Sequence, residues 1–248
     1  MVEALHIRDV HYTYPGGPEA LKGVTLSLKP GETAALLGYN GSGKTTLLLV
    51  AAGLLKPQQG EVLVAGINVS RNPAKARRHI GLLFQDPDDQ LFNPTVFDEI
   101  AFAPRLLGVE GDELHALVEE YAGLVGAKHL LNRPIHTLSL GEKKRVALAS
   151  ILVYKPSLLL LDEPLAGLDP PGAASLLALL CRLHRQGTSI LLSTQNIWLA
   201  EALAEKAHII EDGKIVWSGP PRGPEWEKTL EERKLYPPKL FSGCGSPG

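Results

Sequence analysis

A glycine-rich segment near residue 40 limits the folds open to this chain more than any other part of its sequence. Residues Gly38–Thr45 read Gly-Tyr-Asn-Gly-Ser-Gly-Lys-Thr and match the pattern G-x-x-x-x-G-K-[ST] of a P-loop. The apolar run Thr33–Leu37 before it predicts a short strand, and Lys44–Leu54 after it predicts a helix. This strand–loop–helix context is the one that a P-loop requires. The sequence therefore predicts an α/β domain with this loop at the end of a strand.

A loop of this kind binds phosphate for identifiable physical reasons. Glycines let successive backbone N–H groups turn inward around phosphate oxygens, and the following helix directs its positive end at the same anion. Lys44 is expected to reach the β- and γ-phosphates, and the Thr45 hydroxyl is expected to coordinate Mg²⁺. We therefore predict that the loop binds a nucleotide together with Mg²⁺. The predicted binding residues of this loop are Gly38, Asn40, Gly41, Ser42, Gly43, Lys44, Thr45 and Thr46.

Two adjacent carboxylates follow a second apolar run. Leu158–Leu161 is continuously apolar, as in a strand buried on both faces, and Asp162 and Glu163 come directly after it. Acidic residues at the carboxyl end of a buried parallel strand lie where ligands bind in such sheets. We predict that Asp162 holds Mg²⁺ and that Glu163 polarises the attacking water at the γ-phosphate.

Periodicity along the chain predicts an ordered alternation of elements. Strands are expected first, then a mostly helical stretch, and finally strands alternating with helices, which argues for a parallel sheet. Besides 33–37 and 158–161, the expected strands are 4–12, 24–28, 60–64, 80–84 and 189–193, followed by a hairpin over 207–218. Besides 44–54, the expected helical parts are 95–153, 172–184, 198–207 and one short helix over 225–235.

Composition excludes several classes of protein. The chain has 248 residues and a net charge of −2, so its overall charge does not favour a nucleic-acid partner. Uncharged runs are shorter than the ~20 residues needed to span a bilayer, so a membrane role must come through partners. Met1–Val10 lacks the layout of a signal peptide. Cys181 and Cys244 have no metal-like spacing and are expected to be a core thiol and a tail thiol in a reducing compartment.

A segment between the two phosphate-site motifs narrows the class further. Leu138–Arg145 reads Leu-Ser-Leu-Gly-Glu-Lys-Lys-Arg and resembles the signature of ATP-binding cassette (ABC) ATPases, which is normally Leu-Ser-Gly-Gly-Gln followed by basic residues. Ser139 and Gly141 stand at an expected helix start, which is a natural anion site. In the family this element covers the ATP held by a second subunit, so complete sites form only in a dimer. The sequence leaves open whether that dimer is a homodimer or a heterodimer.

The resemblance covers roughly residues 3–220, and it implies a fold and further site residues. The implied fold is a RecA-like P-loop NTPase with a mostly parallel sheet core, an N-terminal antiparallel β subdomain and an inserted helical subdomain. The ATP-binding domain would span 1–220, with the helical subdomain at about 95–153, and 221–248 would form a tail with a short helix and a flexible end. Gln85 matches the family glutamine that touches Mg²⁺, and Asp169 matches the loop that crosses the dimer interface. Tyr14 matches the aromatic residue that stacks on adenine, and Tyr12 is the alternative candidate for that role.

A narrower match concerns Phe84–Val96, together with Tyr14–Gly17 and Glu142–Ala149. These stretches strongly resemble the ATPases of cobalt transporters and energy-coupling factor importers. The resemblance implies a transmembrane coupling subunit that docks a helix near Asp86–Phe92, where Asp88 and Asp89 could accept an arginine. A substrate-binding membrane subunit would be reached indirectly, at the cytoplasmic face of the cell membrane. Cobalt, nickel and several vitamins all remain open as the transported solute.

Two positions depart from the family pattern. Leu140 stands where the signature has glycine, and the sequence leaves open whether its side chain crowds the partner's nucleotide or points aside. Gln195 stands where the family places a histidine that contacts the γ-phosphate, and an amide donates a hydrogen bond without carrying a charge. The predicted catalytic residues are Glu163, Gln85, Lys44 and Gln195, and the predicted metal ligands are Thr45, Gln85 and Asp162. We predict reduced but real hydrolysis.

Three functions follow from this reading. The first is an ATP-hydrolysing transport motor. The second is a nucleotide-binding regulatory subunit with little turnover, which Leu140 and Gln195 favour and the intact Glu163 opposes. The third is a soluble cassette ATPase acting on DNA or ribosomes, which the acidic run Asp86–Asp89 opposes. The sequence favours the first.

Overall fold

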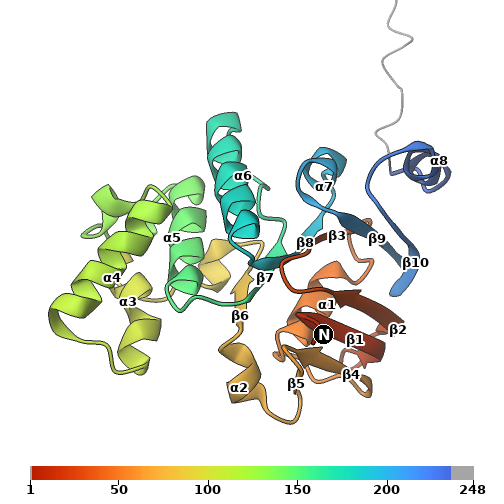
Figure 1. Ribbon diagram of the computed structural model, residues 1–248, viewed down its shortest axis with the longest axis horizontal. Coiled ribbons are helices and arrows are strands. Elements are labelled where there is room, and N and C mark those ends of the chain that lie inside the picture. Colours follow the sequence, from red (N-terminus) through yellow and green to blue (C-terminus); the bar gives the residue numbers. More distant parts are fainter. Residues whose placement is uncertain (1, 236–248) are drawn as a thin grey trace, which may run out of the picture.

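The computed structural model describes residues 2–235 and contains two sheets with helices around them (Figure 1). The larger sheet has the strand order β10-β9-β3-β8-β7-β6, and the smaller has the order β2-β1-β4-β5. The smaller sheet consists of β1 (Leu5–Thr13), β2 (Glu19–Leu28), β4 (Gln59–Val64) and β5 (Ile67–Asn68). All its pairings are antiparallel, which confirms the predicted N-terminal antiparallel subdomain.

The larger sheet places three strand ends at one edge. β3 (Thr33–Leu37), β7 (Leu158–Asp162) and β8 (Ser189–Thr194) are buried along their whole length, because helices cover both faces and the strands are apolar throughout. β3 and β7 both pair with β8 in parallel, with Leu37 beside Thr194 and Asp162 beside Ser193. β6 (Ile80–Leu83) adds to the far side of β7. The loop after Leu37 and the carboxylates after Leu161 therefore emerge side by side.

The helices of the middle of the chain form one end of the molecule, shown in green in Figure 1. They are α3 (Val96–Leu106), α4 (Gly111–Leu124) and α5 (Leu140–Leu152). Thr95 caps α3 and Ser139 caps α5, each accepting a hydrogen bond from a backbone N–H of the first turn. Short 3₁₀ turns at 87–89, 128–130 and 135–137 connect these helices to their surroundings.

The remaining elements are α1 (Lys44–Ala51), α2 (Pro73–Arg77), α6 (Pro170–Arg185), α7 (Ile197–Leu203), β9 (Lys206–Glu211), β10 (Lys214–Gly219) and α8 (Pro224–Glu232). α8 lies where the sequence predicts a short helix. The expected flexible end and Cys244 lie outside the described residues. Within residues 2–235, no helix combines the length and apolar character needed to span a membrane.

Two expected helix ends are wrong. The helix expected over Trp198–Ala207 stops at Leu203, because Lys206 onward joins β9 and pairs in parallel with β3. The helix expected to reach Leu54 stops at Ala51, because Gly53 has a left-handed φ of 67°. The sequence analysis also did not predict α2 or the two-residue β5.

Candidate functional site

The loop between β3 and α1 has the geometry of an anion cradle. Helix α1 begins after Gly43 with no side-chain cap, so its first-turn N–H groups have no side-chain partner. A Cβ at Gly43 would lie 2.7 Å from the carbonyl oxygen of Ala20, so only glycine fits there. Lys44 Nζ donates to the carbonyl oxygens of Gly38 (2.7 Å) and Tyr39 (3.0 Å). Free helix N–H groups beside a buried ammonium suit a bound phosphate.

Electrostatics around Lys44 follow from its burial. The side chain is only 6% exposed, and burial lowers the pKa of Lys44. The carboxylates of Glu163 and Asp162 oppose this by favouring the charged ammonium. A cation held between two carboxylates and a glycine-rich loop is positioned to meet a polyanion.

Asp162 anchors the same edge of the sheet through both its oxygens. Thr45 Oγ1 donates to Asp162 Oδ2 at 2.6 Å, and the Ser193 hydroxyl donates to Asp162 Oδ1. Thr45 comes from α1, Asp162 from the end of β7 and Ser193 from β8, so the sheet register determines this contact. Sequence reasoning missed Ser193, although its strand ends beside that of Asp162.

The donor set around Asp162 fits Mg²⁺. Thr45, Asp162 and Gln85 offer a hydroxyl, a carboxylate and an amide oxygen, and Mg²⁺ takes oxygen ligands from few carboxylates plus phosphates and water. Among residues 2–235, no group of three or more His, Cys, Asp or Glu side chains could hold a metal by itself. The fit is therefore to a metal site that phosphate oxygens complete.

Glu163 follows Asp162 in an unusual backbone conformation. Its φ is +43°, which is rare for a residue with a Cβ. Its Oε2 accepts a hydrogen bond from Thr194 Oγ1 at 3.3 Å, and its Oε1 is buried with no partner among the described residues. Burial raises the pKa of Glu163, whereas the Lys44 ammonium lowers it. A half-buried carboxylate with one oxygen free of protein partners and a raised pKa can act as a general base.

A pocket of about 250 Å³ brings most of the predicted residues together. Its lining includes Tyr14, Asn40, Gly41, Gly43, Lys44, Thr45, Thr46, Gln85, Asp162 and Glu163. Gly38 and Ser42 belong to the loop without lining the pocket, and the Ser42 hydroxyl is buried with no partner among the described residues.

The aromatic side chain at this pocket is that of Tyr14. Its hydroxyl lies 3.2 Å from Thr46 Oγ1, and its ring is 40% exposed. The rival Tyr12 is 8% exposed and packs edge-on against Tyr14, with ring centroids 4.9 Å apart. Of these two tyrosines, Tyr14 therefore has the ring that is free to stack on a ligand.

Gln195 contacts the phosphate loop through one side-chain hydrogen bond. Its Nε2 donates to the Asn40 side-chain oxygen at 2.7 Å, and it does not line the pocket. The residue follows β8, which runs parallel to β3, so both chain segments leave the sheet at the same edge. The amide is thus engaged with the loop rather than directed at the pocket.

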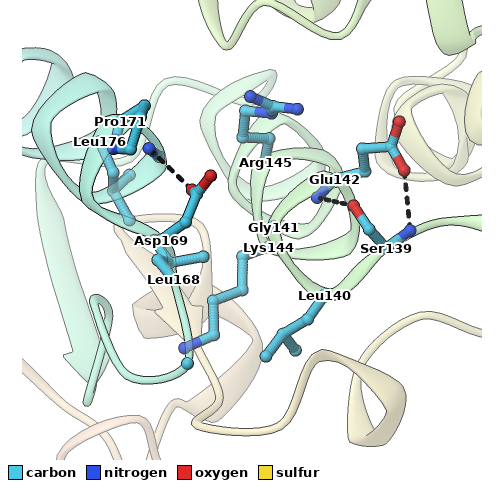
Figure 2. Close-up of a pocket in the computed structure, with 12 residues that line it drawn as sticks. Ser139, Leu140, Gly141, Glu142, Lys144, Arg145, Leu168, Asp169, Pro171 and Leu176 are labelled. Carbon is cyan, nitrogen blue, oxygen red and sulfur yellow. Dashed lines mark hydrogen bonds between the residues drawn. The ribbon is translucent and has the colours of Figure 1, made fainter.

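The other predicted residues lie in a second pocket of about 450 Å³, whose lining includes Ser139, Gly141 and Asp169 (Figure 2). Ser139 and Glu142 form a reciprocal cap: the Ser139 backbone N–H donates to Glu142 Oε2 at 2.7 Å, and the Glu142 N–H donates to Ser139 Oγ at 3.4 Å. Asp169 caps α6 by accepting from the Gly172 N–H at 3.0 Å. The two pockets share no lining residue. One chain therefore carries two separate pockets.

Leu140 lies between this second pocket and the loop after Glu163. A Cβ at Gly167 would lie 2.6 Å from Leu140 Cδ2, so the leucine side chain packs against Gly167 of its own chain. The side chain is still 43% exposed. Within its own chain, Leu140 therefore packs toward the loop that carries Gly167 while still lining the second pocket.

Two side chains near the site were missed by the sequence analysis. Lys144 is 2% exposed, and its Nζ donates to main-chain carbonyls of the loop after Asp162. The sequence did carry a signal for its burial: Lys144 stands three and four residues before Ala147 and Leu148, which are both buried on the same helix. The Tyr39 hydroxyl donates to the carbonyl oxygens of Arg233 (3.2 Å) and Lys234 (2.6 Å), which joins the phosphate loop to the end of α8. No local pattern signals that contact.

Comparison with known proteins shows extensive similarity. The sequence profile described as "ABC transporter" matches residues 21–166. The chain is 45% identical over 224 residues to a putative ABC transporter ATP-binding protein from Methanothermobacter marburgensis. The aligned region covers 89% of this chain and 80% of that protein. It is 43% identical over 218 residues to an energy-coupling factor transporter ATP-binding protein, EcfA, from Methanocaldococcus jannaschii, which covers 87% of this chain and 78% of the relative.

Solved structures give the same picture. CbiO1 from Clostridium perfringens, described as part of the ABC transporter complex CbiONQ, superposes with a TM-score of 0.81 at 34% identity, covering 97% of this chain and 98% of its own. A dimeric ATP-binding cassette in a post-hydrolysis state with bound ADP and phosphate also gives 0.81, at 28% identity over 89% of this chain and 100% of its own.

Proposed function

Because this chain belongs to the ABC transporter family and is an ATPase of that family, we propose that it is the motor subunit of an energy-coupling factor importer. The transported solute would be a metal ion such as cobalt or nickel, or a vitamin, and it would pass through membrane-embedded partners. One observation carries this proposal: Lys44, Asp162 and Glu163 meet at one pocket, while Ser139 and Asp169 lie in another. Two such half-sites on one chain suit a motor that works as a dimer.

In the proposed mechanism, the chain's own residues bind and orient the nucleotide. Tyr14 would stack on the base, and the loop with its Lys44 ammonium would hold the phosphates. Mg²⁺ would be held by Thr45, Asp162 and Gln85, and when bound it neutralises charge on the phosphates. Glu163 would accept a proton from the attacking water through its free Oε1, and its raised pKa favours that role.

The second half-site would act on the nucleotide of the other subunit. The start of α5 carries Ser139 and Gly141, and a helix N-terminus favours phosphate. ATP would then hold two subunits together, and hydrolysis would release them. Dimeric assembly is supported by a similar cassette, whose solved structure is a dimer with bound ADP and phosphate.

A docking surface for the membrane partner would lie beside α3. Phe92 is 67% exposed and packs edge-on against Phe102, and Leu106 on the same helix is 72% exposed. Asp88 already pairs with Lys143 at 2.6 Å, so Asp89, which forms no ion pair among the described residues, is the better acceptor for an arginine. Exposed apolar side chains beside an acidic turn suit a helix that carries one basic residue. The chain would thus sit at the cytoplasmic face of the membrane through its partners.

Replacing Glu163 by glutamine tests the motor proposal. The amide keeps the shape of the side chain and cannot accept the proton, so turnover is expected to fall by about 100-fold or more while ATP still binds. With ATP and Mg²⁺, this variant is expected to accumulate as a dimer in light scattering. Glu113→Gln on the exposed face of α4 is the matched control.

The same experiment separates the alternative function. A regulatory subunit with little hydrolysis would give equally low turnover in wild type and Glu163→Gln. Gln195 favours that alternative, because its amide is engaged with Asn40. Equal turnover in both proteins would therefore contradict the motor proposal.

A further inference from the structure

The side chain of Lys144 connects two parts of the chain that serve different half-sites. Its Nζ donates to the carbonyl oxygens of Glu163 (3.1 Å), Pro164 (3.5 Å) and Ala166 (2.7 Å). Figure 2 shows the side chain extending from α5 toward the loop that carries Leu168. A lysine ammonium has three N–H donors, and three main-chain acceptors lie within reach. The side chain is 2% exposed, so little water competes for these donors.

The loop that receives Lys144 holds the proposed general base. Glu163 has its φ at +43°, a conformation that costs energy for any residue with a Cβ. The Glu163 carbonyl oxygen also accepts from the Ala166 N–H at 3.1 Å, which closes a tight turn. Carbonyl oxygens that converge on one point repel each other unless a donor lies between them. The ammonium supplies that donor, so it stabilises the turn and with it the strained backbone of Glu163.

Lys144 is rigidly connected to the other half-site through α5. The helix starts at Leu140 after the Ser139 cap, so Lys144 lies less than one turn from Gly141 and about one and a half turns from Ser139. A shift of the helix start would carry the ammonium with it. The carbonyls of residues 163–166 would then have to follow or lose their donor.

We propose that Lys144 is a positioning residue that fixes Glu163 relative to the start of α5. It couples the half-site that covers a partner's nucleotide to hydrolysis in the chain's own half-site. This inference rests on the proposed function, because it requires two subunits that share their ATP sites. It assigns the coupling to a side chain whose ammonium is engaged with main-chain carbonyls of residues 163–166.

Lys144→Met tests the inference, because it keeps the length of the apolar stem and removes the ammonium. We expect kcat for ATP hydrolysis to fall by about 10- to 100-fold, since misplacing a catalytic group by about 1 Å has that effect. The Kd of the chain for ATP with Mg²⁺ is expected to change by less than about threefold, because Lys144 lines the second pocket and not the pocket that contains the phosphate loop. Lys128→Met, at an exposed lysine of the same helical region, is the matched control and should leave both quantities unchanged.

A conservative variant separates positioning from a purely structural role. Lys144→Gln carries two N–H donors on a shorter side chain, so it should recover part of the lost kcat. A structural role alone would lower the melting temperature and the folded fraction while leaving kcat per folded molecule unchanged. If Lys144→Met does not fold, kcat and Kd are measured for Lys144→Gln instead and compared with those of the wild type.

The outcomes distinguish the two levels of inference. Wild-type kcat together with wild-type Kd in Lys144→Met would overturn the role of Lys144 and leave the motor proposal intact. A parallel loss of ATP binding and turnover would also overturn it, because the residue would then act on binding. Absence of turnover in the wild-type protein would instead contradict the proposed function itself.

Discussion

Replacing His208 by glutamine is expected to remove part of the acid sensitivity of folding. His208 lies on β9, which pairs with β3 next to the phosphate loop. Its ring is 1% exposed, its Nδ1 lies 2.7 Å from Ser218 Oγ, and its Nε2 has no hydrogen-bond partner among the described residues. Burial, together with the smaller effect of the Lys206 ammonium, lowers the pKa of His208 from 6.5 to about 4. The folded chain therefore keeps this imidazole neutral where the unfolded chain protonates it.

The sign and size of the effect follow from that shift in pKa. Above about pH 6.5 the imidazole is neutral in both the folded and the unfolded chain, and the full unfolding free energy is present. As the pH falls from about 6.5 to about 4, the unfolded chain takes up a proton that the folded chain does not, and this part of the unfolding free energy is lost. A shift from 6.5 to about 4 corresponds to about 3 kcal/mol of unfolding free energy, and about 2 kcal/mol of it is lost between pH 7 and pH 5. The window lies above the usual range of carboxylate titration, so His208 can be observed separately.

Urea unfolding of the nucleotide-free protein at pH 7, 6 and 5 measures this contribution. The wild-type unfolding free energy is expected to fall by about 2 kcal/mol more than that of His208→Gln across this range. His129→Gln, at an exposed ring, is the control. A glutamine variant whose acid sensitivity equals that of the wild type would refute the reasoning, whatever its stability at pH 7.

Two further predictions concern the phosphate loop and the last helix. Gln195→His is expected to raise kcat by up to about tenfold, because an imidazole donor replaces an amide that is hydrogen-bonded to Asn40. An unchanged kcat in the assembled complex would mean that this position does not limit hydrolysis. Trp226→Ala is expected to lower the unfolding free energy by about 3–5 kcal/mol, because the ring is 1% exposed and its Nε1 donates to Glu201 at 2.8 Å. Thermal unfolding measures this, and a melting temperature near that of the wild type would show that α8 contributes little to the folded core.

Local patterns were sufficient to predict the elements whose structure depends on local contacts. The glycine-rich loop, the strand before it and the carboxylates after Leu161 are each determined by a few consecutive residues, and the structure places them as expected. The family resemblance and the α/β fold are likewise confirmed. The end of α7 could not be predicted this way. Residues from Lys206 onward are in a strand rather than in the helix because they pair with β3. Their own sequence does not indicate that they pair with this strand.

The same reasoning explains which side chains of the site were missed. Asp162 and Glu163 follow a buried apolar run, so their position could be read from the sequence alone. Lys144 binds a carbonyl 22 residues away, and Tyr39 binds one 195 residues away. Both contacts exist only after distant elements have packed together. The residues that connect parts of this site are therefore harder to predict than the residues that line it.

The leucine that departs from the family signature belongs to the same set of contacts. Leu140 packs against Gly167, the residue directly after Ala166, whose carbonyl oxygen receives the Lys144 ammonium. The loop after Glu163 is thus held by a charged contact and by an apolar contact, both from the first two turns of α5. A glycine at position 140 would leave the charged contact alone. The departure from the family pattern therefore adds an apolar contact between α5 and the loop of its own chain, next to the carbonyl oxygen that Lys144 binds.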